Sequence, residues 1–326
     1  MFKNLLEFSG ATARAWSRAV ICRFPPLKKG GWGDFVRSLI DNRRKSPSIP
    51  LLQRGKYSVA SAPDEILVGT QKESKVFLVG AGPGAPDLLT LRAARLLAEA
   101  DIVFYDALVH PETVALAVNA KKVAVGKRAG QVSTDQRFIN RNLVEAAARY
   151  QTVVRLKGGD PMLFGRAQEE IDELKAAGVA YEVVPGITAA LAASAQLGVS
   201  LTRRGLARSV AFATPRIGPD ESASEWAASV LNADTAVLYM AAGQAPQIAA
   251  TLIAQGKPAG TPVVVVESAT LPEERRIHTS LAGLGASTLN LSGPAVLCIG
   301  EVFRVLAASS HEVLLRELHA SRSLAH

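Results

Sequence analysis

Glycine-rich loops follow several apolar stretches of this chain, and they are its most informative chemical feature. They read Gly-Ala-Gly-Pro-Gly at residues 80–84, Lys-Gly-Gly-Asp-Pro at 157–161, Pro-Gly-Ile-Thr-Ala at 185–189 and Met-Ala-Ala-Gly at 240–243. Glycine lets a ligand approach the backbone closely and tolerates positive φ. Ligands of α/β sheets lie beyond the carboxyl ends of the strands. Several such loops at one sheet edge therefore predict a nucleotide-like ligand held by main-chain groups.

The first loop also permits a dinucleotide site. Its glycines alternate with other residues, and Asp106 follows the next apolar stretch, where an acid that binds ribose could lie. The spacing differs from Gly-x-Gly-x-x-Gly, however, and Pro83 lacks the N–H that would donate to a pyrophosphate. From these residues alone, a dinucleotide site and a purely structural turn both stay open.

Two charged residues near strand ends are candidates for proton transfer. Asp106 and Lys127 each follow an apolar stretch closely. A carboxylate and an amine beside one cleft could exchange protons with a substrate. Two solvated loop charges are the simpler alternative.

Arg155 stands inside an apolar stretch, and a buried guanidinium needs an anionic partner. That partner is either an internal acid or a substrate carboxylate. From these residues alone both alternatives stay open. Other arginines near the loops could join it: Arg128, Arg166, Arg203, Arg204, Arg208 and Arg216.

The remaining side chains predict no metal site. The five histidines are scattered without ligand spacing, and no Ser/His/Asp or Cys/His set occurs. Cys22 and Cys298 are too few and too far apart for a disulfide framework or a zinc site. A reducing, cytoplasmic setting fits them best.

Strand and helix patterns alternate from Lys75 onward, and the strands are β-branched and apolar on both faces. Expected strands are 76–79, 102–105, 123–125, 152–156, 181–184, 209–214, 235–240, 262–267, 275–279 and 295–299. Expected helices are 88–100, one opened by Pro111, 135–150, 166–177, 187–197, 222–231 and 244–255. The pattern predicts two α/β domains with mostly parallel or mixed sheets and an interdomain cleft. Their expected bounds are 75–186 and 187–310, with a tail at 311–326.

Residues 1–74 form a basic extension that we expect to be disordered. Residues 1–60 contain 12 Lys or Arg and 3 Asp or Glu, a net charge of +9, whereas the whole chain carries +8. The folded part is therefore near neutral and gives no reason to expect nucleic-acid binding. Residues 1–24 are faintly like an organelle transit peptide. The uncharged stretch 183–201 reads as strand, turn and helix rather than as a membrane span.

Taken together, the loops resemble those of the uroporphyrinogen-III C-methyltransferases, a branch of the S-adenosylmethionine-dependent tetrapyrrole methylases. Besides the first and third loops, the resemblance rests on Tyr-Asp-Ala-Leu-Val at 105–109 and Val-Gly-Lys-Arg-Ala-Gly at 125–130. It also rests on Arg-Leu-Lys-Gly-Gly-Asp-Pro at 155–161 with Phe-Gly-Arg at 164–166, and on Gly-Leu-Ala-Arg-Ser-Val at 205–210. The motifs occur in the order of the family and span about residues 75–305.

The resemblance implies a homodimer of two-domain subunits, with S-adenosylmethionine in the interdomain cleft and uroporphyrinogen III as substrate. Asp106 and Lys127 match the proton acceptor and donor. The implied cofactor residues are Pro83, Gly158, Gly159, Asp160, Leu163, Thr188, Ala189, Met240, Ala269, Pro294 and Ala295, with Gly293 beside the last two. Methylation at C2 and C7 would give precorrin-2 for sirohaem or cobalamin. For such a substrate we expect Arg155 to have a mixed but mainly substrate-side role, because a polycarboxylate needs fixed, always-charged donors.

Some residues depart from the family pattern. Ala85 replaces a common acid, Arg203 stands where histidine is frequent, and Thr-Pro-Arg at 214–216 replaces Thr-Gly-His. The last two leave details of substrate contact open. Residues 1–74 are too few for the dehydrogenase/ferrochelatase module of some members, so we expect none. The alternatives are a methyltransferase acting on a later precorrin, a dinucleotide-dependent oxidoreductase, or a binding module that only senses S-adenosylmethionine.

Overall fold

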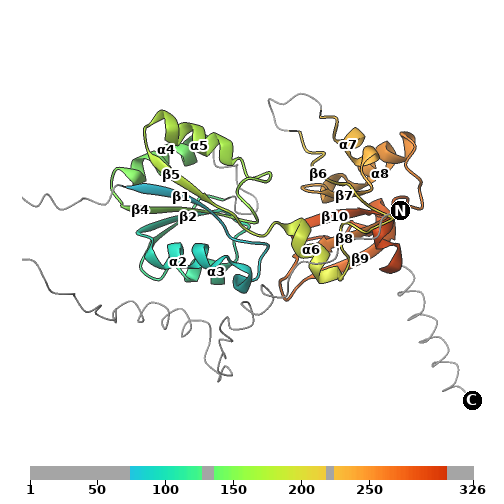
Figure 1. The fold of residues 1–326 in the computed structure, drawn as a ribbon, viewed down its shortest axis with the longest axis horizontal. Helices are drawn as coiled ribbons and strands as arrows, with labels where there is room; N and C mark the ends of the chain where they lie inside the picture. The colour runs from blue at the N-terminus through green and yellow to red at the C-terminus, as the bar shows by residue number, and fades with distance from the viewer. Residues whose placement is uncertain (1–73, 127–135, 218–223, 307–326) are drawn as a thin grey trace, which may run out of the picture. The chain divides into compact units, whose positions relative to one another are not determined.

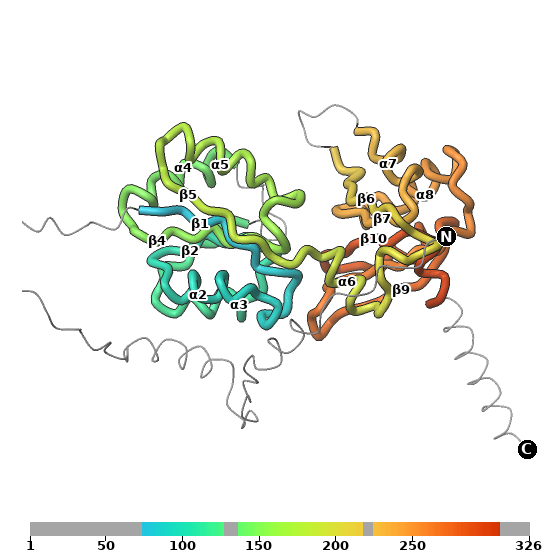
Figure 2. The backbone as a smooth tube through the Cα atoms, in the orientation of Figure 1, coloured from blue at the N-terminus to red at the C-terminus, as the bar shows by residue number. Residues whose placement is uncertain are grey.

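The first half of the fold is a five-stranded parallel sheet (Figure 1). A computed structural model of the chain describes residues 74–126, 136–217 and 224–306. The strands are β1 (Lys75–Gly80), β2 (Ile102–Tyr105), β3 (Lys121–Ala124), β4 (Thr152–Lys157) and β5 (Ala180–Val184), in the order β3-β2-β4-β1-β5. All pairs are parallel, so the carboxyl ends of the five strands lie at one edge. Figure 2 shows β1 between β4 and β5, which come later in the chain.

Helices cover both faces of this sheet (Figure 1). The helices α2 (Leu91–Glu99) and α3 (Pro111–Ala115) pack on one face, while α4 (Gln136–Ala147) and α5 (Ala167–Ala176) pack on the other. A short 3-10 helix, η2 (Pro86–Leu88), precedes α2. All six residues of β4 are buried, as expected for a central strand of a covered parallel sheet.

The second half is a mixed sheet with the order β6-β7-β10-β8-β9. Its strands are β6 (Val210–Ala213), β7 (Thr235–Leu238), β8 (Pro262–Glu267), β9 (Arg275–Ser280) and β10 (Ala295–Gly300). Only β6 and β7 are parallel neighbours; the other pairs are antiparallel.

Helices also cover both faces of this second sheet. The helix α6 (Ala189–Leu197) packs on one face, and α7 (Trp226–Asn232), α8 (Ala245–Ala254) and α9 (Leu284–Ser287) pack on the other. Two 3-10 turns, η3 (Ala242–Gln244) and η4 (Glu301–Phe303), complete it. No helix within the described ranges is long and apolar enough to cross a bilayer.

One parallel and one mixed sheet, each covered by helices, confirm the predicted fold class. The expected strands and helices are present with small shifts at their ends. The expected helix 88–100 begins only at Leu91, because Thr90 caps it by accepting the Ala93 N–H at 3.1 Å. The strand expected at 235–240 ends at Leu238, since Met240 adopts a left-handed φ of 54°. The stretch 183–201 contains the end of β5 and all of α6, as expected.

Some predictions fall outside the described ranges. The tails at 1–73 and 307–326 and the start of the helix expected at 222–231 do so. The short helix α9 was not expected. The domain bounds 75–186 and 187–310 stay a prediction.

Candidate active site

Three glycine loops meet at the carboxyl ends of β1, β4 and β5. Gly82 and Gly159 form an isolated bridge: each N–H donates to the carbonyl of the other, at 3.2 and 2.7 Å. A Cβ atom added to Gly186 would lie 2.3 Å from the Gly159 carbonyl oxygen and 2.9 Å from the Gly80 Cα. Only glycine permits this approach, so these residues fix how the three loops pack.

Asp160 ties two of these loops together. Its Oδ1 accepts the Met162 N–H at 2.8 Å, and its Oδ2 accepts the Gly186 N–H at 2.9 Å. The Asp160 carbonyl also accepts the Leu163 N–H at 3.3 Å. The carboxylate therefore orders the backbone of residues 158–163 against the loop after β5.

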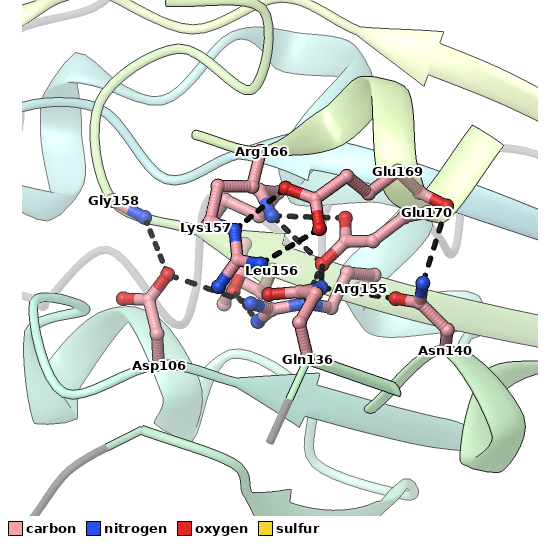
Figure 3. A network of polar contacts seen from close by, with 10 residues as sticks. All are labelled: Asp106, Gln136, Asn140, Arg155, Leu156, Lys157, Gly158, Arg166, Glu169 and Glu170. Carbon is pink, nitrogen blue, oxygen red and sulfur yellow. Dashed lines mark hydrogen bonds and ion pairs between the residues drawn. The ribbon is translucent and has the colours of Figure 1, made fainter. Parts of the chain in front are cut away.

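Asp106 lies directly after β2, beside the end of β4 (Figure 3). Its Oδ1 accepts the Leu108 N–H at 3.1 Å, and its Oδ2 accepts the Gly158 N–H at 3.3 Å. The side chain is 24% exposed, so the carboxylate is anchored and still open to solvent. Its predicted partner Lys127 lies outside the described residues, as does Arg128.

Arg155 has an internal acid for a partner, so the expectation that it mainly serves the substrate is wrong (Figure 3). Its Nε donates to Glu170 Oε1 at 3.0 Å, and its Nη1 donates to the Leu156 carbonyl at 3.0 Å. The residue is 4% exposed. Its Nη2 lies 3.9 Å from Asp106 Oδ2, which links the buried charges to the candidate site.

Lys157 shares the same acid. Its ammonium donates to both Glu170 oxygens, and Gln136 on α4 donates to Oε1 at 3.2 Å. Burial, together with the nearby Arg155 charge, lowers the pKa of Lys157 despite Glu170. Glu170 was not predicted as a site residue, although it lies on the buried face of α5 with Ala167, Ile171 and Leu174. The sequence signal that could have identified it is an acid on the otherwise apolar face of the helix that follows a strand with two cations.

The other implied cofactor residues open α6, follow β7 or β8, or lie at the start of β10. Thr188 is the N-cap residue of α6, and its Oγ1 lies 2.6 Å from the Tyr239 hydroxyl. Met240 follows Tyr239 and is 44% exposed. Ala269 is buried between Ser268 and Thr270, whose φ angles are 51° and 72°. Left-handed φ at non-glycine residues stores strain, which is concentrated at functional sites in proteins.

Hydrogen bonds connect these residues to the first glycine loop. The Ala85 N–H donates to Thr270 Oγ1 at 3.0 Å, and a Cβ atom on Gly84 would lie 3.2 Å from the Ala269 carbonyl oxygen. The Ser268 N–H donates to the Pro294 carbonyl at 2.8 Å, next to Ala295. The structure thus brings the loop with Pro83 beside Ala269, and Ala269 beside Pro294.

Glu267 holds the loop before β10 and was not predicted. It is 2% exposed, and its Oε1 accepts the N–H groups of Ser292 (2.6 Å) and Gly293 (2.5 Å). Arg275 pairs with Oε2 at 2.7 Å. Burial alone would raise the pKa of Glu267, but these hydrogen bonds and Arg275 together lower it below its usual value.

Among the described residues, the arginines outside the buried network are exposed. Arg166 forms a two-pronged pair with Glu169, at 2.6 and 2.7 Å. Arg203, Arg204 and Arg208 lie in the turn before β6, and Arg216 lies after it. These side chains present positive charge to solvent.

Comparison with known proteins places these loops in one family. The sequence profile of the tetrapyrrole (corrin/porphyrin) methylases matches residues 75–285. A uroporphyrinogen-III C-methyltransferase of Pseudomonas aeruginosa is 44% identical over 232 residues, which cover 71% of this chain and 94% of that protein. A siroheme synthase of Azotobacter vinelandii is 46% identical over 234 residues, covering 71% of this chain and 50% of that protein. The chain thus spans about half the length of the siroheme synthases that it matches.

The fold agrees with a solved structure. Uroporphyrin-III C-methyl transferase from Thermus thermophilus, complexed with S-adenyl homocysteine, superposes with a TM-score of 0.64 at 41% identity. The match covers 71% of this chain and 100% of that one.

Proposed function

Because the chain belongs to the tetrapyrrole (corrin/porphyrin) methylase family, we propose that it methylates uroporphyrinogen III at C2 and C7 with S-adenosylmethionine, giving precorrin-2. The observation that carries this proposal is the 44% identity to a uroporphyrinogen-III C-methyltransferase over 94% of that protein. The neighbouring structure with S-adenyl homocysteine supports the choice of cofactor. Precorrin-2 would then serve sirohaem or cobalamin synthesis.

The residues present fit such a cofactor. A Cβ atom on Gly159 would meet only the Thr188 Cα, at 4.0 Å, so this glycine leaves its backbone open on that side. Gly158, Gly159 and Asp160, in the loop after β4, would hold the cofactor together with Thr188 and Ala189 at the start of α6 and Met240 after β7. Pro83, Leu163, Ala269, Pro294 and Ala295 would complete the pocket. When bound, S-adenosylmethionine supplies an electrophilic sulfonium methyl group.

The chain's own groups would then handle the substrate and its protons. Methylation of a pyrrole carbon leaves a cationic ring that must lose a proton. Asp106, anchored by two backbone N–H groups with part of its carboxylate exposed, is suited to accept a proton there. Lys127 would act as the donor, and the exposed arginines would meet the carboxylates of the substrate. Residues 75–186 and 187–310 would form the two domains, in a cytoplasmic homodimer.

Product mass spectrometry tests this function. The full chain is incubated anaerobically with uroporphyrinogen III and S-adenosylmethionine, and the oxidised products are weighed. Two added methyl groups per tetrapyrrole, with two S-adenosylhomocysteines released, are expected. If uroporphyrinogen III is not methylated but a later precorrin is, the chain is instead a later-precorrin methyltransferase of the same family. Binding of NAD without binding of S-adenosylhomocysteine would reject the methyltransferase altogether. Light scattering after gel filtration tests the dimer.

A further inference from the structure

Tyr239 directly follows β7, and its hydroxyl makes hydrogen bonds at the start of another element, α6. The hydroxyl lies 2.6 Å from Thr188 Oγ1 and accepts the Ala190 N–H at 3.0 Å. Thr188 and Ala190 belong to the first turn of α6, nearly fifty residues earlier in the chain. One side chain therefore anchors the segment that contains Thr188 and Ala189.

The helix α6 does not cap itself. An N-cap residue normally offers its side-chain oxygen to an N–H of the first turn. Thr188 occupies the N-cap position with φ −75° and ψ 150°, yet its side chain makes no such bond. The Tyr239 oxygen accepts the Ala190 N–H instead, so the Tyr239 side chain caps α6. The Thr188 hydroxyl is thereby released from capping.

The donors and acceptors of the Tyr239 and Thr188 hydroxyl groups limit where the Thr188 proton can lie. A hydroxyl has one proton to donate and two lone pairs that accept. The Tyr239 oxygen accepts the Ala190 N–H at 3.0 Å, and either hydroxyl can be the donor in its 2.6 Å contact with Thr188 Oγ1. When Tyr239 donates, its proton lies on Thr188 Oγ1, and the Thr188 proton is left for another acceptor. Burial raises the pKa of Tyr239 although both hydrogen bonds oppose the shift, so the phenol stays protonated at neutral pH. In this arrangement Thr188 keeps its own proton to donate to a ligand.

The ring of Tyr239 is fixed by aromatic neighbours. Phe164, in the loop after β4, lies 5.1 Å away between ring centroids, and Phe212 of β6 lies 6.3 Å away in a T-shaped arrangement. Phe164 has a left-handed φ angle of 53°, and Met240, which follows Tyr239, has one of 54°. A ring held on two sides leaves the hydroxyl little freedom to leave Thr188.

We infer that Tyr239 is a positioning residue for the cofactor: it caps α6 in place of Thr188 and orients the Thr188 hydroxyl as a hydrogen-bond donor to the bound molecule. This inference rests on the proposed function, in which Thr188 and Ala189 contact S-adenosylmethionine.

Calorimetry with S-adenosylhomocysteine on the full chain tests it. Tyr239→Phe keeps the ring and removes only the hydroxyl, so binding should weaken about threefold to tenfold, as one neutral hydrogen bond is lost. Thr188→Val should weaken binding at least as much, whereas Thr188→Ser, which keeps the hydroxyl, should bind nearly as the wild type does. The matched control is Tyr181→Phe, a half-buried tyrosine of β5, which should leave affinity unchanged.

The double variant separates the two roles of the hydroxyl. If Tyr239 acts on the cofactor through Thr188, adding Tyr239→Phe to Thr188→Val should reduce affinity less than about twofold further. The melting temperature should still fall in both backgrounds, because the cap of α6 is lost in each. This split between affinity and stability would not arise from a general loosening of the fold.

Other results would overturn the inference. Wild-type affinity for S-adenosylhomocysteine in a folded Tyr239→Phe variant would do so. So would a double variant whose fold-loss of affinity equals the product of the losses in the two single variants. Should Tyr239→Phe fail to fold, equal affinities of Thr188→Val and wild type would have the same effect. A wild-type chain that binds no S-adenosylhomocysteine would instead remove the proposed function, and this inference with it.

Discussion

The ammonium group of Lys157 lies 2.8 and 2.9 Å from the two carboxylate oxygens of Glu170. Arg155, two residues earlier on β4, donates to the same acid, because alternate side chains of a strand face the same way. The three residues are all under 5% exposed, so two buried cations depend on one carboxylate and on Asp106 nearby. A change in any of them should affect stability before it affects substrate binding.

Arg155→Lys tests this assignment. The variant keeps the charge but loses the fork that reaches Glu170 and the Leu156 carbonyl, so the free energy of unfolding should fall by about 1–3 kcal/mol. The KM for uroporphyrinogen III should stay unchanged, because the guanidinium is buried. Urea unfolding and steady-state kinetics measure both, with the exposed Arg149→Lys as control. A raised KM with unchanged stability would return Arg155 to the substrate site.

Glu267→Gln should make stability less sensitive to acid. The folded pKa of Glu267 is lowered, so its ionised form stabilises the fold above the unfolded value of 4.5, and this contribution is lost as pH falls through the folded pKa. At pH 7 the variant should be about 1–3 kcal/mol less stable. The difference from wild type should shrink below pH 4.5. Thermal melts between pH 3 and 7 test this, with the exposed Glu273→Gln as control; a difference that is constant across this range would contradict it.

Gly186→Ala should disrupt the junction of the three glycine loops. Its methyl group would overlap the Gly159 carbonyl oxygen and the backbone of Gly80. Backbone cannot move aside as a flexible side chain can, so we expect about 1–3 kcal/mol of lost stability and at least tenfold weaker binding of S-adenosylhomocysteine. Gly260→Ala is the control, since an added Cβ there meets nothing within 4 Å. Equal behaviour of the two variants in calorimetry would show that the loop junction is not needed.

Asp160→Ala and Asp106→Asn should separate cofactor binding from proton transfer. Loss of the Asp160 carboxylate frees the N–H groups of Met162 and Gly186, so affinity for S-adenosylhomocysteine should fall about tenfold or more. Asparagine at 106 retains an oxygen that can accept a backbone hydrogen bond but cannot take up a proton at neutral pH. Its affinity should change little, while kcat falls about 100-fold or more. The reverse pattern in calorimetry and kinetics would exchange the two roles.

The fold was predictable because each element carries its own local pattern. Apolar β-branched stretches, Pro111 at a helix start and Gly178 after a helix placed the elements within a few residues. Glycine loops at strand ends located the candidate site for the same reason. The supporting residues were not predictable, because their partners are remote in sequence: Glu170 lies 15 residues from Arg155, and Tyr239 lies 51 from Thr188.

The expectation for Arg155 failed at the same point. Its apolar neighbours correctly indicated burial, but a sequence does not show which acid approaches a buried cation. The acid is Glu170, on the next helix along the chain, and it neutralises the charge of Arg155 without a substrate.

The central place of β1 also bears on how the chain folds during synthesis. In the order β3-β2-β4-β1-β5, β1 pairs only with β4 and β5, so its first partner begins at Thr152, about 70 residues after β1 ends. At roughly 5–20 residues per second, the ribosome needs about 4–14 s to make that stretch. During this interval an apolar strand with unsatisfied backbone groups is outside the ribosome or in its exit tunnel. The first sheet is therefore dependent on late pairing, and β1 is the segment where chaperone binding and aggregation would compete with folding.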